Sequence, residues 1–232
     1  MQQDDENTIL TLIPANNEAV RIGAVITAAR QFLPLLVVDD GSRDETASLV
    51  EQLGVEVYRQ IPNQGKGAAL RTGFKLALDK GCQAVITLDA DGQHDPLEIP
   101  KFLASYFENR SDLIIGSRDF SEMPFVRKLA NTLGRMTFSW AVRQPVRDNQ
   151  SGYRLISRRL MEAMLESKES GFEFEVEMVV LCLKNQFQLD WVPIRTIYMD
   201  QGSHIQPLAH LRHFVDMIIK TRRQTAPQKK TK

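Results

Sequence analysis

Short apolar runs alternate with longer amphipathic stretches through the first half of the chain. The runs are rich in valine, isoleucine and leucine, as buried strands are. The stretches between them carry apolar residues at helical spacing. This alternation is typical of strand–helix units repeated around a mainly parallel sheet. It predicts strands within residues 8–14, 34–40, 55–60, 84–90 and 112–118, and helices over 18–30, 44–53, 66–80 and 96–109.

The rhythm changes after Arg118. The pattern there predicts a helix over 125–142, a strand at 151–157, helices through Glu162 and Glu175, a strand at 189–198 and a helix at 207–222. No linker rich in proline or glycine separates the halves, so we expect the second half to form a lid and an antiparallel addition to the same sheet. The predicted fold is α/β, one domain over residues 1–222 with helices on both faces of a mainly parallel sheet, followed by a disordered basic tail at 223–232.

The segment GFEFEVEM around Glu175 can be interpreted in two ways. Its alternation with a period of two favours a strand by count. The apolar spacing over Phe174, Met178 and Leu181 favours a helix instead. In the helical interpretation, Glu175 points either into a site or towards solvent.

Composition narrows the function classes. The 232 residues are 43% hydrophobic, enough for a sizeable core, and Lys plus Arg equal Asp plus Glu at 29 each. No overall field would therefore draw the protein to nucleic acid, and a bound anion must meet a local site. Cys82 and Cys182 lie far apart in apolar segments, as reduced core residues of a cytosolic protein do.

Membrane attachment is open on sequence grounds. The segment MQQDDENT lacks the basic and apolar regions of a signal peptide, and no apolar run reaches the ~18 residues that span a bilayer. We therefore expect a cytoplasmic protein. The helix predicted at 207–222 has an apolar stripe with basic residues beside it and a lysine-rich tail after it. Packing against the sheet and peripheral contact with the inner face of an anionic membrane both fit this stripe.

Polar side chains cluster just after the predicted strands, where ligands bind in open parallel sheets. Asp89 and Asp91 give the strongest signal, because two nearby carboxylates repel unless they share a cation or a proton. Oxygen ligands suit Mg²⁺ or Mn²⁺, which keep room for water and substrate phosphates. Gln93 supplies a further amide oxygen. A polar turn with solvated acids is the simpler alternative for each of these loops.

The remaining loop residues have competing structural roles. In DDGSRDET, turn formation and helix capping by Asp44 explain most positions, with ligand contact by Asp39 or Asp40 as the alternative. Asp95 before Pro96 is expected to cap a helix. His94 is either a softer metal ligand or a loop residue, and the second interpretation, which assigns it no role, is favoured.

The segment NQGKGAALRTGF lacks the spacing of a Walker phosphate loop, which disfavours a nucleoside triphosphatase. Lys66 or Arg71 either reaches a diphosphate or ribose, or is simply solvated on the first turns of the helix.

Together and in order, these motifs resemble family 2 of the glycosyltransferases, with the GT-A fold, and most of all the dolichol-phosphate mannose synthase and polyprenyl-phosphate glycosyltransferase group. The resemblance runs from Ile9 to about Ile219. It is carried by IPANNE, VVDDGSRDET, NQGKGAALRTGF, LDADGQHDP, IIGSR, DNQSGYRLISR, FEFEVEM and VPIRTIY.

The resemblance implies roles for individual residues. Asp89, Asp91 and Gln93 would hold Mg²⁺ or Mn²⁺ on the diphosphate. Arg118 would face the reacting phosphates, and Asp148 with Ser151–Arg154 would shape the sugar and acceptor side. The residues implied to contact the nucleotide sugar are Pro14, Asn16, Glu18, Val38, Asp39, Asp40, Lys66, Asp89, Ala90 and Asp91.

The implied reaction is metal-dependent, inverting transfer of a hexose from a nucleoside-diphosphate sugar, GDP-mannose or a UDP-sugar, to a polyprenyl phosphate. Such an acceptor is already anionic, so it needs cations, not a base. If the acceptor is a hydroxyl, Asp148 is the candidate general base. Arg127 and Arg135 fit ordinary surface positions of one helix equally well. The candidate acceptor-side residues are Arg118, Arg127, Arg135, Arg147, Ser151 and His204, and the candidate catalytic ones Asp91, Arg118 and Asp148.

One departure from the group concerns cations near the last strand. Mannose synthases of this group tend to have an Arg and a following Ser-Lys where this chain has Tyr198 and Ser203-His204, although Arg195 or a protonated His204 would substitute. Three rivals follow: a transferase acting on a soluble or saccharide hydroxyl, a nucleotidyltransferase, and an inactive sugar-nucleotide-binding module. The absence of a Gly-rich loop with Arg after the first strand disfavours the second, and intact Asp89, Asp91 and Arg118 disfavour the third.

Overall fold

The structure is a computed structural model that describes residues 8–118, 125–148, 151–171, 173–195 and 221–222, with the backbone alone over 125–131. The strands are β1 (Ile9–Ala15), β2 (Leu35–Asp39), β3 (Glu56–Arg59), β4 (Ala84–Thr87), β5 (Leu113–Arg118), β6 (Arg154–Ser157) and β7 (Leu189–Ile194). The helices are α1 (Ile22–Ala29), α2 (Thr46–Gln52), α3 (Lys66–Asp79), the 3₁₀ turn η2 (Pro96–Glu98), α4 (Ile99–Asn109), α5 (Phe125–Val142), α6 (Arg158–Met164) and α7 (Glu173–Lys184).

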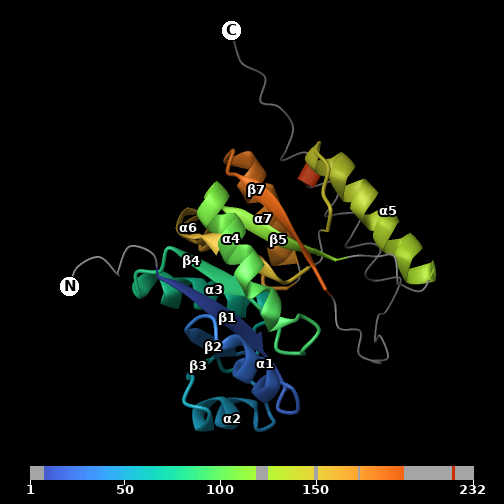
Figure 1. Ribbon diagram of the computed structural model, residues 1–232. Helices are drawn as coiled ribbons and strands as arrows, with labels where there is room; N and C mark the ends of the chain where they lie inside the picture. Colours follow the sequence, from blue (N-terminus) through green and yellow to red (C-terminus); the bar gives the residue numbers. More distant parts are fainter. Residues whose placement is uncertain (1–7, 119–124, 149–150, 172, 196–220, 223–232) are drawn as a thin grey trace.

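The strands form one seven-stranded sheet in the order β3-β2-β1-β4-β6-β5-β7 (Figure 1). Every neighbouring pair is parallel except those of β6, which runs antiparallel to both β4 and β5. The predicted α/β fold and the addition of the second half to the same sheet are therefore confirmed. The antiparallel strand is inserted inside the sheet, between strands that the first half contributes.

Two apolar layers cover the sheet, because successive strand residues face opposite sides. Leu10 and Leu12 of β1 pack in the cluster that contains α3, α6 and α7. Ile13 and Ala15 pack in the cluster with α1 and α4. Both cysteines are buried and unbonded, as the sequence predicts. Within the described part of the chain, no helix is both long and apolar enough to cross a bilayer.

Several predicted boundaries shift for local reasons. The helix predicted from Glu18 begins at Ile22, because residues 18–21 form a turn in which Glu18 O accepts from Arg21 N. The helix predicted from Pro96 begins as the turn η2, and Asp95 caps it by accepting a hydrogen bond from Leu97 N, as predicted.

Residues 173–184 are helical, so the helical interpretation of the GFEFEVEM segment is confirmed. The strand predicted at 151–157 covers only Arg154–Ser157. The final helix at 207–220, the tail and the end of the last predicted strand lie outside the described residues.

Candidate active site

The reversed direction of β6 brings distant parts of the chain together. The parallel strands all end at one edge of the sheet, which we call the carboxyl edge. Because β6 is antiparallel, the segment before it arrives at that edge as well, and Thr87 at the end of β4 pairs with Arg154 at the start of β6. Thr87 Oγ1 also donates to Gly152 O at 2.7 Å. The predicted acidic loop after β4 therefore lies beside the predicted acceptor segment.

The ends of β1 and β2 form one part of this edge. Pro14 and Val38 are register partners there, and both are buried. Asp39 is 1% exposed, and its Oδ1 has no hydrogen-bond partner among the described residues. Asn16 Nδ2 donates to Asp40 O at 2.7 Å. An unmatched buried carboxylate oxygen is costly and makes Asp39 a candidate to receive N–H donors from a ligand.

Asp40 and Glu18 are already engaged by their own chain. The Asp40 carboxylate accepts from Gln60 Nε2 at 2.7 Å and from Gln64 N and Gly65 N at 2.8 Å each. It thus fixes the loop that leads into α3. Glu18 pairs with Arg21 at 2.9 Å. Both residues lie where the sequence predicts nucleotide contact, and that contact stays a prediction.

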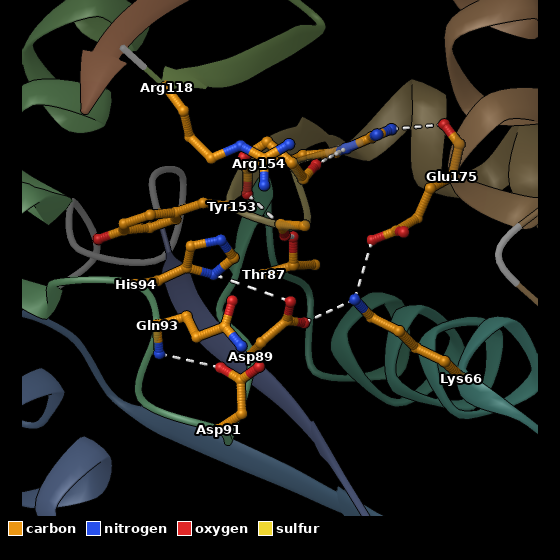
Figure 2. Close-up of polar contacts among 12 residues, drawn as sticks. Lys66, Thr87, Asp89, Asp91, Gln93, His94, Arg118, Tyr153, Arg154 and Glu175 are labelled. Carbon is orange, nitrogen blue, oxygen red and sulfur yellow. Dashed lines mark hydrogen bonds and ion pairs between the residues drawn. The ribbon is translucent and has the colours of Figure 1, made fainter. Parts of the chain in front are cut away.

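Lys66, the first residue of α3, lies between two carboxylates (Figure 2). Its Nζ is 2.7 Å from Asp89 Oδ1 and 3.1 Å from Glu175 Oε1. Burial alone would lower the pKa of Lys66, but the two carboxylates outweigh it and raise that pKa above its ordinary value. Burial alone would raise the pKa of Asp89, but the positive charges nearby, above all that of Lys66, outweigh burial and lower this pKa below its ordinary value. Lys66 and Asp89 are therefore both charged at neutral pH.

Gly152 closes one side of this cluster. A Cβ atom there would lie 2.6 Å from Asp89 Oδ2 and 2.9 Å from Lys66 Nζ, closer than real Cβ contacts. A side chain at residue 152 would therefore displace one or both of these charged groups.

His94 and Tyr153 cover the cluster from the acceptor side. His94 is 5% exposed and its ring lies 5.2 Å from that of Tyr153. Its Nδ1 is 3.8 Å from Asp89 Oδ2, beyond hydrogen-bond distance. Burial lowers the pKa of His94, against the opposing charge of Asp89, so the ring is neutral at pH 7. His94 lies in the loop between β4 and η2, as predicted, and its ring is buried there.

The predicted metal ligands stand on the loop after β4. Gln93 N donates to Asp91 Oδ1 at 2.9 Å, so the backbone turns around Asp91 (Figure 2). No cluster of three His, Cys, Asp or Glu side chains in the described part of the chain could hold a metal by itself. Asp89, Asp91 and Gln93 still fit a hard divalent ion, because all supply oxygen and such ions keep waters and phosphate oxygens in their shell.

Arg118, at the end of β5, and Asp148 form a two-pronged ion pair. Arg118 Nε donates to Asp148 Oδ2 at 2.7 Å and Nη2 donates to Oδ1 at 3.0 Å. Asp148 is 2% exposed. Because both of its oxygens accept from the guanidinium, Asp148 orients Arg118 at the carboxyl edge.

Arg154 is the structural anchor of the acceptor segment. It is 1% exposed, and it donates through Nε to Ser151 O at 2.8 Å and through Nη1 to Glu175 O. It thereby ties α7 to the segment that holds Gly152. Ser151 Oγ is buried and finds no hydrogen-bond partner among the described residues.

The remaining predicted acceptor residues are not brought into this cluster. Arg135 is half-buried on α5, and Arg147 is exposed just before Asp148. Neither forms a hydrogen bond or ion pair with another described residue of the carboxyl edge. The side chain of Arg127 and all of Tyr198, Ser203 and His204 lie outside the described residues. Arg71, an alternative diphosphate ligand, instead donates to the carbonyls of Ser167 and Glu169 at 3.0 Å each.

The sequence analysis did not predict the contacts of three residues of the cluster: Gly152, which the resemblance placed only generally on the sugar and acceptor side, and Glu175 and His94, which had no firm role. Only the helical spacing around Glu175 gave a signal, since it allowed that side chain to face the site. The contacts of Gly152 and His94 depend on β6 lying beside β4, which no local pattern encodes.

Comparisons with known proteins agree with this geometry. The family model described as glycosyl transferase family 2 matches residues 11–165. The chain is 31% identical over 205 residues to the polyprenol monophosphomannose synthase of Mycolicibacterium smegmatis, covering 80% of this chain and 76% of the relative. It is 29% identical over 230 residues to the UDP-N-acetylglucosamine–dolichyl-phosphate N-acetylglucosaminyltransferase of Methanococcus voltae, covering 86% and 91%.

Among solved structures, the fold resembles glucosyl-3-phosphoglycerate synthase from Mycobacterium tuberculosis in complex with Mn²⁺, UDP-glucose and phosphoglyceric acid. The TM-score is 0.72 at 20% identity, with 93% of this chain and 80% of that chain covered. At this identity the likeness concerns the fold, which is that of GT-A glycosyltransferases. The family match covers more than half of the chain, so the protein belongs to glycosyl transferase family 2 and is an enzyme that transfers sugars.

Proposed function

We propose that the protein transfers a hexose from a nucleoside-diphosphate sugar, GDP-mannose or a UDP-sugar, to a polyprenyl phosphate, with inversion at the anomeric carbon and with the help of Mg²⁺ or Mn²⁺. The observation that carries the proposal is the set of oxygen ligands on Asp89, Asp91 and Gln93 at the carboxyl edge. Both relatives named above are named for transfer to a polyprenol or dolichyl phosphate.

On the donor side, Asp89, Asp91 and Gln93 would hold the divalent ion. That ion would neutralise charge on the departing nucleoside diphosphate. Asp39, with its unmatched buried oxygen, is suited to accept from an N–H group of the base. Lys66 contributes a second fixed positive charge next to the diphosphate position.

On the acceptor side, the ion pair of Arg118 and Asp148 supports a phosphate acceptor. A phosphate oxygen is already a nucleophile and needs a cation to position it, which Arg118 supplies. A hydroxyl acceptor would need a general base, and both oxygens of Asp148 accept from Arg118. Transfer to a soluble or saccharide hydroxyl is therefore the second candidate.

The test is transfer of radiolabelled sugar from a panel of GDP- and UDP-sugars, with a polyprenyl phosphate in detergent as acceptor. We expect label in an organic-extractable, acid-labile product, and loss of transfer in chelator that added Mn²⁺ restores. Label that stays in water-soluble product would favour the hydroxyl acceptor. Undiminished transfer in chelator would contradict the metal assignment. Nuclear magnetic resonance of the anomeric proton of the product checks inversion.

Attachment to the membrane follows from such an acceptor. Without a spanning helix among the described residues, we propose peripheral contact through the basic C-terminal segment. Sedimentation with anionic vesicles, compared between the full chain and a chain ending at residue 222, checks the contribution of the tail.

A further inference from the structure

Lys66 and a divalent ion would compete for the same oxygen. Lys66 Nζ lies 2.7 Å from Asp89 Oδ1, and Asp89 is the residue that the proposed function assigns to the ion. A carboxylate oxygen this close to an ammonium cannot also accept a metal at ~2.1 Å without bringing two positive charges together. Lys66 therefore weakens ion binding at Asp89 unless its ammonium group has a second partner.

Glu175 offers that second place. Its Oε1 lies 3.1 Å from Lys66 Nζ, and its side chain is 6% exposed against 24% for Asp89 (Figure 2). The ammonium thus needs to shift only slightly to exchange a shared position for full pairing with Glu175. A buried carboxylate without this cation would be costly, which keeps the lysine nearby.

Hydrogen bonds to the backbone fix the start of α3, which carries Lys66, and the start of α7, which carries Glu175. Gly67 N, one residue into α3, donates to Ser170 O at 2.7 Å, which fixes α3 against the segment before α7. Arg154 fixes the carbonyl of Glu175 from the other side. Gly152 leaves space beside the ammonium, since a Cβ atom there would lie 2.9 Å from Lys66 Nζ.

We propose that Glu175 is a positioning residue that takes Lys66 from Asp89 when the divalent ion and the donor diphosphate enter, so that the ammonium vacates the metal ligand yet stays beside the diphosphate. This inference rests on the proposed function, because it requires a metal at Asp89. It assigns Glu175 a role in ion binding that acts through Lys66.

The proposed exchange predicts that two substitutions change the affinity for Mn²⁺ in opposite directions. Lys66→Met removes the competitor and should tighten Mn²⁺ binding to the nucleotide-free protein. Glu175→Gln removes the alternative partner, leaves Lys66 on Asp89 and should weaken Mn²⁺ binding. We expect about tenfold in each direction, within the range measured for directly interacting side chains. Glu173→Gln, on the exposed start of the same helix, changes the net charge equally and should have no effect.

The double variant, Lys66→Met with Glu175→Gln, distinguishes the proposed exchange from a direct effect of the Glu175 charge on the ion. If Glu175 acts through Lys66, Glu175→Gln changes Mn²⁺ affinity little once Lys66 is Met. If Glu175 attracts the ion only through its own charge, Glu175→Gln weakens Mn²⁺ binding by the same factor with Lys66 present and in the Lys66→Met variant. In that case the proposal is wrong.

Mn²⁺ binding to the full chain is measured by electron paramagnetic resonance of the free ion, with and without saturating UDP or GDP. Circular dichroism of each variant checks its fold, and Glu175→Gln with its Glu173→Gln control suffices if Lys66→Met does not fold. Absence of Mn²⁺ binding by the wild-type chain, even with nucleotide, would overturn the metal part of the proposed function and this inference with it. Wild-type binding with equal affinities for all variants would overturn the inference alone.

Discussion

Asp89 and Asp112 lie at opposite ends of the same sheet, and their carboxylates are used differently. Asp112 precedes β5 and accepts from Ser157 Oγ at 2.9 Å, from Gln188 N at 2.9 Å and from two nitrogens of Arg159. Asp89 follows β4 and has Lys66 Nζ at 2.7 Å from Oδ1, whereas the neutral ring of His94 lies 3.8 Å from Oδ2.

The two carboxylates differ in how much capacity each has left to bind a ligand. A carboxylate whose lone pairs are filled by its own chain stabilises the fold and has no capacity left for a ligand. Asp89 and the buried Asp39 keep unfilled capacity, which costs stability unless a ligand supplies the donors or a cation. We therefore propose that the carboxyl edge is the functional end of the sheet and that the opposite end, with Asp112, is a structural one.

The largest expected effect is on catalysis at the functional end. Asp91→Asn keeps the shape of the loop but weakens a predicted ligand of the ion. We expect the transfer rate to fall by ~10²- to 10³-fold, as loss of one electrostatic stabiliser commonly does. The free energy of unfolding should change by no more than about 0.5 kcal/mol. Steady-state transfer assays and urea denaturation check both; a rate near wild type would remove Asp91 from the site.

The next effect is on stability at the structural end. Asp112→Ala leaves Ser157, Gln188 N and Arg159 without their acceptor, and we expect the free energy of unfolding to fall by about 2 kcal/mol. The rate per folded molecule should be unchanged. Asp79→Ala, an exposed position at the end of α3, is the control and should be neutral. A variant that kept its stability but lost activity would reverse the comparison.

A smaller effect is expected from a substitution at Gly152, which packs beside the charged groups of Asp89 and Lys66. Gly152→Ala forces a Cβ atom against Asp89 and Lys66, and overpacking of this kind costs ~1–3 kcal/mol. We expect kcat/KM to fall about tenfold, equivalent to ~1.4 kcal/mol. Gly23→Ala is the matched control, because a Cβ there meets nothing within 4 Å in the helix α1. Equal behaviour of the two variants would show that the crowding is relieved elsewhere.

The smallest effect is on the pH dependence of stability. Burial would raise the pKa of Asp112, but its hydrogen bonds to Arg159, Gln188 and Ser157 outweigh this and lower it. A lowered folded pKa stabilises the protein above the unfolded value of about 3.9, and this stabilisation is lost as the pH falls towards the folded value. The stability difference between wild type and Asp112→Asn, by urea denaturation, should stay constant from pH 7 to 5 and shrink as the pH falls below about 4. A difference that stayed constant to pH 3 would contradict the assignment.

The parts of the fold that sequence predicts are those with local causes. The apolar runs of β1, β2, β4 and β5 and the cap at Asp95 are encoded within a few residues, so they were found almost at their observed bounds. The same holds for the placement of Asp89 and Asp91 after a strand, since strand direction alone brings those loops to one edge.

The parts that sequence could not predict depend on long-range pairing. Nothing near Arg154 says that β6 lies between β4 and β5, so the contact of Gly152 with Asp89 had no signal. For the same reason, the pairing of Asp148 with Arg118 had no signal in the sequence, and the role of Asp148 as a candidate base stays a prediction. Residues that act through a neighbour on another element, such as Glu175, are the hardest class to find from a single sequence.

The insertion of β6 also bears on the order of folding. Thr87 Oγ1 and the carbonyl of Arg154 belong to residues 67 positions apart, so the chain between them must close a long loop before β6 can pair with β4. Closing such a loop costs entropy before any contact compensates for it, whereas β1, β2 and α1 pair over short separations. The contacts of the acidic loop after β4 with Gly152 and Tyr153 therefore form only when β6 joins the sheet, and in refolding experiments enzymatic activity should return after most of the helical signal.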